Sequence, residues 1–162
     1  MTDRLVHTLW CDDIRQEVGN KPSFMGAYIA GLGVGALPAL LPRLCMFTWI
    51  TTPVERPIHE LVLRVVRDDG QVLAEVKPEG MAAGAGADPQ LRQGSTRKVI
   101  MSGIAIAPLE IPVGCRFLQV VIEADGELLK GPRLWVEVNA ELVASIMNQP
   151  PRAAQLAVDQ GT

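Results

Sequence analysis

The fold class is decided by the stretch Glu60-Leu61-Val62-Leu63-Arg64-Val65-Val66-Arg67-Asp68-Asp69-Gly70-Gln71-Val72-Leu73-Ala74-Glu75-Val76. Leu61, Leu63 and Val65 recur at every second position before the Asp-Asp-Gly step, and this is the period of a half-buried strand. Gly70 can supply the positive φ angle that tight hairpin loops need. The stretch therefore predicts a β-hairpin whose strands cover residues 60–67 and 71–76.

The same two-residue period runs through most of the chain. Asp125-Gly126 is a second strong hairpin signal, and nothing in the chain alternates strand with helix as a nucleotide-binding α/β fold would. These features predict an all-β fold, a single antiparallel β-sandwich (immunoglobulin-like or a related Greek key) of seven to eight strands. A partly open barrel is the alternative. Further strands are expected at residues 5–12, 24–29, 44–52, 97–107, 115–124 and 134–139.

The chain has 162 residues, which fits one domain. We expect a β-sandwich domain over residues 1–139 and a tail over residues 140–162, in which a short helix at 140–147 precedes a Pro-Pro step. Residues 77–96 are rich in glycine, alanine and proline and predict a long surface loop. Loops of that length are usually mobile or engaged in binding.

Composition, charge and cysteine content indicate which partners the protein can bind and where it is located. The net charge is −3 and aromatic residues make up 4% of the chain, so both the basic field and the stacking surface typical of nucleic-acid binding are lacking. Cys11, Cys45 and Cys115 are odd in number and far apart in sequence, which fits neither a disulfide framework nor a zinc site. Free thiols and an N-terminal stretch unlike a signal peptide predict a cytoplasmic protein.

Residues 22–42 carry no charged side chain and are long enough to cross a bilayer. Four glycines, together with Pro38 and Pro42, argue against a membrane helix, so we expect no membrane contact. The pattern Gly31-x-Gly33-x-Gly35 resembles a phosphate-binding loop, but it lacks the helix and the lysine that usually follow. We interpret it as a plain loop and expect no cofactor.

The densest group of charges follows the first expected strand. Its members are Asp12, Asp13, Arg15 and Glu17. Carboxylates there could bind calcium, as in sandwich domains that bind phospholipid through acidic loops, but calcium prefers about six to eight oxygens and one loop offers too few. The turns that contain Asp68, Asp69 and Asp125 would add ligands if they met this loop at one end of the sandwich. The alternative is a solvated strand end in which Arg15 pairs with an aspartate.

His7 and His59 are the only histidines, and neither lies at motif spacing from a serine, a cysteine or an acid. A hydrolase could assemble a Cys/His pair across space from Cys11 or Cys115, but no nucleophile-elbow or family cysteine signature is present. We therefore expect a protein that is not an enzyme and has no catalytic, cofactor-binding or metal-binding residues.

Strand alternation allows Trp10, Trp135, Val62 and Val66 to lie on outward faces. An exposed apolar surface of this kind marks a contact with another protein or a second subunit. Both faces would instead be covered if the sandwich closes more completely than the alternation suggests.

Several segments carry a family resemblance. They are Cys11-Asp12-Asp13-Ile14-Arg15-Gln16-Glu17-Val18-Gly19-Asn20-Lys21, Met25-Gly26-x-Tyr28, Leu41-Pro42-x-Leu44-Cys45, Leu61-x-Leu63-Arg64-Val65, Ile111-Pro112-x-Gly114 and Asp125-Gly126-Glu127-Leu128. Over residues 5–138 the chain resembles an uncharacterised family of small bacterial and phage or prophage-borne β-sandwich proteins. The resemblance implies a single sandwich, an association with a prophage and no assigned catalytic residue.

The sequence thus favours a non-enzymatic module for protein interaction or assembly, with a protein partner or with self-association as a homo-oligomer. Two alternatives stay open. One is a calcium- or lipid-responsive sandwich that uses Asp12, Asp13 and the acidic turns, and the other is a hydrolase with a Cys/His pair.

Overall fold

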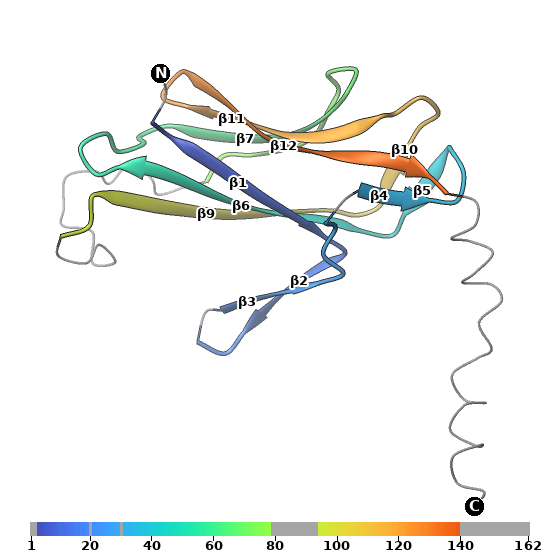
Figure 1. Ribbon diagram of the computed structural model, residues 1–162, viewed down its shortest axis with the longest axis horizontal. Coiled ribbons are helices and arrows are strands. Elements are labelled where there is room, and N and C mark those ends of the chain that lie inside the picture. Colours follow the sequence, from blue (N-terminus) through green and yellow to red (C-terminus); the bar gives the residue numbers. More distant parts are fainter. Residues whose placement is uncertain (1–2, 20, 30, 79–93, 140–162) are drawn as a thin grey trace, which may run out of the picture.

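The computed structural model describes residues 3–19, 21–29, 31–78 and 94–139 (Figure 1). Within these ranges every regular element is a β-strand, which confirms the all-β prediction. None of them is a helix with the length and apolar character needed to cross a membrane. The strands are β1 (Leu5–Cys11), β2 (Asp13–Glu17), β3 (Lys21–Met25), β4 (Gly31–Val34), β5 (Ala39–Leu41), β6 (Leu44–Pro53), β7 (Leu61–Arg67), β8 (Val72–Val76), β9 (Arg97–Ile106), β10 (Leu109–Ile111), β11 (Phe117–Ala124) and β12 (Glu127–Val138).

The strands form two larger sheets and two small ones. One larger sheet has the order β1-β6-β9 and the other has the order β4-β12-β11-β7-β8, and Figure 1 shows them as two layers. β5 pairs with β10, while β2 and β3 form a hairpin that projects from the body of the molecule. Each sheet is open and has two edge strands, which leaves β1, β9, β4 and β8 at the edges of the larger sheets.

One hydrophobic core joins the two larger sheets. Alternate residues of β6 and β9 face alternate residues of β7, β11 and β12, as the two-residue period of a strand requires. The largest fully buried apolar side chains are Leu32, Leu44, Met46, Ile50, Leu63, Ile111, Leu118, Ile122, Val65 and Val120.

Both hairpins predicted from the sequence are present. β7 and β8 pair antiparallel, and Gly70 in their turn has a φ angle of 87°. β11 and β12 meet at Asp125 and Gly126, whose φ angles are 50° and 78°. Positive φ at both turn residues is the requirement of a type I′ hairpin, which explains the Asp-Gly sequence.

Two predictions about topology are wrong. The Gly31-x-Gly33 segment is not a loop but lies in β4, which runs parallel to β12, so the larger sheet is not wholly antiparallel. Glycine suits this strand because a Cβ on Gly31 would lie 3.0 Å from the carbonyl oxygen of Trp135. The expected seven to eight strands are also too few, because β2, β4, β5 and β10 are short and lack a clear alternating pattern.

Some expectations fall on residues that the structure leaves undescribed. The helix expected at 140–147 and the tail at 140–162 lie outside the described residues. The same holds for residues 79–93, which are the larger part of the expected loop at 77–96.

Arg4 is the one charged side chain that is buried within the described ranges, with 3% of the residue exposed. Its guanidinium donates hydrogen bonds to the carbonyl oxygen of Ala124 at 2.8 Å, to Asp125 Oδ2 at 2.7 Å and to Glu127 Oε2 at 3.4 Å. Arg4 directly precedes β1 of one sheet, whereas the acceptors lie at the β11–β12 turn of the other. The guanidinium therefore fastens the two larger sheets together at one end.

Replacing Arg4 should be costly. Arg4→Met leaves the acceptors at the β11–β12 turn without their buried donor, so we expect a loss of about 3 kcal/mol in the free energy of unfolding. Arg56→Met is the matched control, because Arg56 also pairs with Glu127 but its side chain is 49% exposed. It should lose less than about 1 kcal/mol. Urea denaturation measures both, and equal losses would show that Arg4 does not hold the two larger sheets together.

Candidate functional site

The candidate site is the face of the β1-β6-β9 sheet that points away from the core, called here the outer face. The strand register places the odd-numbered residues of all three strands on it. Its members are Leu5, His7, Leu9 and Cys11 of β1, Cys45, Phe47, Trp49, Thr51 and Pro53 of β6, and Arg97, Val99, Met101, Gly103 and Ala105 of β9.

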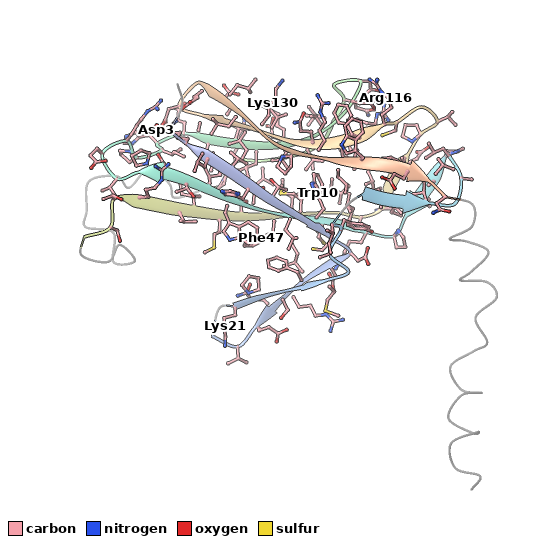
Figure 2. The ribbon with its side chains drawn as sticks, viewed as in Figure 1. Asp3, Trp10, Lys21, Phe47, Arg116 and Lys130 are labelled. Atoms are coloured by element: carbon pink, nitrogen blue, oxygen red, sulfur yellow. The ribbon has the colours of Figure 1, made fainter. Side chains whose placement is uncertain are left out.

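This register corrects one sequence prediction. Trp10, expected to be a candidate outward residue, is only 4% exposed and belongs to the core. Figure 2 shows it between the layers, whereas Phe47 lies on the side toward the β2–β3 hairpin. The outward side of β1 is instead the one that carries Leu5 and Leu9.

The β2–β3 hairpin covers one half of the outer face. The ring of Phe24 lies 5.1 Å from that of Phe47 and 6.0 Å from that of Trp49, centroid to centroid, in edge-to-face contacts. Ile14 packs over Gly103, since its Cδ1 atom would lie 3.6 Å from a Cβ placed there. The hairpin thereby buries Cys11 and Cys45 although both lie on the outer face.

The other half of the outer face is apolar and open. Leu5 and Val99 are each 51% exposed and lie in one cross-strand row with Thr51. Met101 is 59% exposed and lies in the neighbouring row of the same face with His7. Large apolar side chains gathered on a sheet face are typical of a contact surface.

The main-chain groups of β9 make the open half a potential strand-pairing site. Thr96, in register with the β6–β9 ladder, accepts a hydrogen bond from the backbone N–H of Val54 at 3.0 Å. In an antiparallel ladder successive residues point their N–H and C=O groups to opposite sides. The even-numbered residues of β9 therefore bond to β6, and the odd-numbered residues direct their main-chain groups to the other edge of β9, where no strand in the described part of the chain pairs.

The outer side of the five-stranded sheet differs in chemistry. Trp135 is 46% exposed, as expected, and its ring lies 5.4 Å from that of Phe117. Arg133 places its guanidinium carbon 4.3 Å from the centre of the Phe117 ring, a cation–π contact. Val62 and Val66 are half-buried on the same sheet.

Ion pairs cross that outer side. Arg64 bonds Glu75 Oε2 at 2.7 Å and Glu123 Oε2 at 3.0 Å, between the valines of β7. The hydrogen bonds of Arg64 to these two carboxylates raise its pKa further. Charged side chains are therefore interspersed with the exposed apolar ones on this side of the five-stranded sheet.

The acidic residues singled out in the sequence lie apart. Ala124 pairs with Leu61 at one end of β7, and Leu118 pairs with Arg67 at the other. Asp125 therefore lies at the opposite end of the sheet from Asp68 and Asp69. Among the described residues, no three His, Cys, Asp or Glu side chains are grouped as a metal site would require.

The aspartates among these acids each have a cationic or hydroxyl partner. The hydrogen bond from Arg43, at 2.6 Å, lowers the pKa of Asp13, and the one from Arg116, at 2.8 Å, lowers that of Asp68. Arg67 lowers the pKa of Asp69 to about 2. Asp12 accepts a hydrogen bond from the hydroxyl of Tyr28. Arg15, expected to pair with an aspartate, lies 3.6 Å from Asp13 Oδ2.

Glu17, the remaining acid of the group, is exposed on β2, where it pairs in register with Lys21 of β3.

The structure does not assemble the Cys/His pair that a hydrolase would need. His7 and Cys11 lie on one face of β1 but four residues apart, which is roughly 13 Å along a strand. His59 donates its backbone N–H to Asp125, and the Cys115 thiol lies 3.9 Å from the carbonyl oxygen of Phe117. Burial raises the pKa of the Cys115 thiol, which disfavours the nucleophilic thiolate.

A cavity of about 310 Å³ lies between the β7–β8 turn and the corner before β10. Arg67, Gln71 and Leu73 line one side, and Ile106, Leu109 and Glu110 line the other. Arg67 is already paired with Asp69, so its charge is compensated within the protein.

Comparison with known proteins gives a family without an assigned role. Residues 7–137 match a family of unknown function, DUF6941. The chain belongs to this family. The expectation of an uncharacterised family is thereby confirmed. No curated protein and no solved structure matches the chain.

Sequence reasoning missed the open half of the outer face and the meeting of two cysteines beneath the hairpin. One signal for the first was present, because Val99 and Met101 alternate with Ile100 and Ile104, which makes β9 apolar on both faces. A strand that is apolar on both faces is expected to be covered on both.

Acid should destabilise the protein through Asp125. Burial raises the pKa of this carboxyl, but hydrogen bonds from the backbone N–H groups of Glu60 and His59, both at 2.9 Å, and from Arg4 outweigh it and hold the pKa below its ordinary value of 3.8. A lowered native pKa stabilises the fold above about pH 4, and this stability is lost as pH falls through the native pKa.

Asp125→Asn should therefore flatten the fall in melting temperature between about pH 4 and pH 2. Glu110→Gln, at an exposed carboxyl of β10, is the control and should follow the parent protein. Thermal unfolding at stepped pH measures all three. Parallel pH curves for the parent and Asp125→Asn would show that the carboxylate is not held by these bonds.

Proposed function

We propose that this protein is a non-enzymatic β-sandwich, immunoglobulin-like or a related Greek key, that acts in the cytoplasm as a protein-interaction or assembly module. We further propose that its partner at the site is a second copy of the same chain, joined edge to edge through β9. The prophage association implied by the sequence resemblance belongs to this proposal. Its main support is that β9 has one edge to which no strand of the described residues pairs, beside an apolar outer face.

β9 is the longest of the edge strands in the two larger sheets, at ten residues against seven, four and five for β1, β4 and β8. It contains no proline and carries its two charges, Arg97 and Lys98, at its first two positions. Natural edge strands are usually blunted by proline, by charge or by a covering segment. Residues 97–106 therefore have the properties of a strand that pairs.

Self-pairing suits the sequence of β9. In an antiparallel pair of copies centred on Met101, Val99 of each copy lies opposite Gly103 of the other, and Arg97 lies opposite Ala105. The basic residues of the two copies then fall at opposite ends of the new ladder, where they do not repel each other. The outer faces of both copies would join side by side into one apolar surface, and Met101 of each copy would lose part of its exposure to water against Met101 of the other.

The free thiols support the proposed cytoplasmic location. Cys11, Cys45 and Cys115 are all free and buried in the structure. Reduced, buried cysteines are the usual state in the cytoplasm.

Association should depend on Met101. Light scattering after size-exclusion chromatography should give a mass that rises toward two chains at about 50 µM protein, a concentration at which small interfaces associate. Met101→Lys would bring two ammonium groups together across the pair and should give the mass of one chain. Val113→Lys, at an apolar residue that is 73% exposed away from β9, is the matched control and should associate as the parent does.

Either of two results would reject self-pairing through β9. One is a parent protein that keeps the mass of one chain at about 100 µM, a concentration at which even weak pairs should be detected. The other is a Met101→Lys variant that associates as strongly as the parent.

A further inference from the structure

We propose that Cys11 and Cys45 form a cross-strand dithiol that hydrogen peroxide converts to a disulfide, which ties β1 to β6 beneath the β2–β3 hairpin. The proposal is independent of pairing through β9, since both cysteines lie under the hairpin and not at the free edge. It makes a modification site of two residues that are far apart in sequence.

The two cysteines face each other directly. Cys11 is the register partner of Cys45 in the β1–β6 ladder, and both side chains lie on the outer face. The backbone N–H of Tyr28 donates to the carbonyl oxygen of Trp10 at 2.8 Å, so Trp10 points its main-chain groups away from β6. Its neighbour Cys11 therefore points them toward β6, and Cys11 and Cys45 form a hydrogen-bonded pair.

This pairing has nearly the geometry of a disulfide. The Cα atoms of a hydrogen-bonded antiparallel pair lie about 5.5 Å apart, inside the range of roughly 4.4–6.8 Å found across disulfides. Cβ atoms of such pairs lie up to about 5.5 Å apart, so they must approach by roughly 1 Å for the bond to form. β1 is an edge strand and can make this adjustment. The resulting bond carries some strain and should be readily reduced.

The surroundings of the thiols control their reactivity. Both residues are at most 1% exposed. Burial, the neighbouring Cys45 and then Asp12 and Asp13 raise the pKa of Cys11 to about 11, while hydrogen bonding with the backbone at Asp13 lowers it. Burial likewise raises the pKa of Cys45, against hydrogen bonding with the backbone at Ile14. Both thiols are therefore neutral while the hairpin is closed, and peroxide reaches them when it lifts.

The chemistry uses one equivalent of peroxide. One thiolate attacks a peroxide oxygen, which breaks the O–O bond, gives a sulfenic acid and releases hydroxide. The second thiol then attacks the sulfenic sulfur, and the S–S bond forms as water leaves. In sum two thiols lose two electrons and two protons, and one peroxide becomes two waters. Cys115 has no cysteine opposite it and lacks this second step.

Peptide mapping after peroxide treatment tests the proposal. Trypsin cuts after Arg4, Arg15 and Arg43, so the disulfide should link the peptide 5–15 to the peptide 44–64. We expect this linked pair in most chains of the parent and of Cys115→Ser, and its disappearance on treatment with dithiothreitol. Cys45→Ser should give no linked pair. If that variant fails to fold, the parent and Cys115→Ser alone decide the outcome.

The hairpin supplies a second measurement. Phe24→Ala removes the ring that packs on Phe47 and Trp49, so the hairpin should open more often and the linked pair should form on the order of tenfold faster. Phe117→Ala, which removes a comparable ring from the other sheet, should leave the rate unchanged. Separate oxidation of Cys11 and Cys45 to sulfinic acids, or cross-linking that involves Cys115, would overturn the proposal.

Discussion

The alternation of side chains along β6 is the constraint on which the rest of the structure depends. β6 is the central strand of its sheet, hydrogen-bonded to β1 on one side and to β9 on the other. Leu44, Met46 and Ile50 on its inner side fill the core, so the intervening residues must point outward. A slip of β1 or β9 by one residue against β6 would turn the core side chains of that strand, such as Trp10 or Ile104, into water, so the registers of both strands are fixed as well.

The outward residues of β6 explain why the outer face is divided. Phe47 and Trp49 are too large and apolar to stand alone in water, and the β2–β3 hairpin meets them with Phe24. The hairpin begins directly after β1 and is short, so it reaches only the half of the face that carries Cys11 and Cys45. The other half keeps its exposed apolar side chains, and beside them one edge of β9 has no partner strand within residues 3–19, 21–29, 31–78 and 94–139.

The sequence predicted local structure well. The all-β class and both hairpins followed from the two-residue period and from Asp-Gly steps, since these signals act between residues that are close in the chain. Which side of a strand faces the core was harder to predict. In β1, one side carries Leu5 and Leu9 and the other carries Val6 and Trp10, so hydrophobicity alone did not indicate which side is buried.

The candidate site depended on strand order, which the period does not encode. The facing of Cys11 and Cys45 follows from the β1–β6 pairing, and the separation of Asp125 from Asp68 follows from the β7–β11 register. β4 was not predicted because Gly31 is required there by its close approach to Trp135 of β12, and this requirement leaves no apolar pattern in the sequence. The acidic stretch at 12–17 suggested a cation site, whereas Asp12 is bonded by Tyr28, and Asp13 is paired with Arg43 and Arg15.

Amide hydrogen exchange along β9 tests the proposed pairing most directly, because it measures the protection of each backbone N–H of this strand separately. The register predicts that the amides of Val99, Met101, Gly103 and Ala105 exchange quickly in dilute protein, while those of Ile100, Ser102 and Ile104 are protected by β6. Raising the protein concentration should slow the first group and leave the second unchanged. If the amides of the first group exchange quickly at every protein concentration, two copies do not pair through this strand.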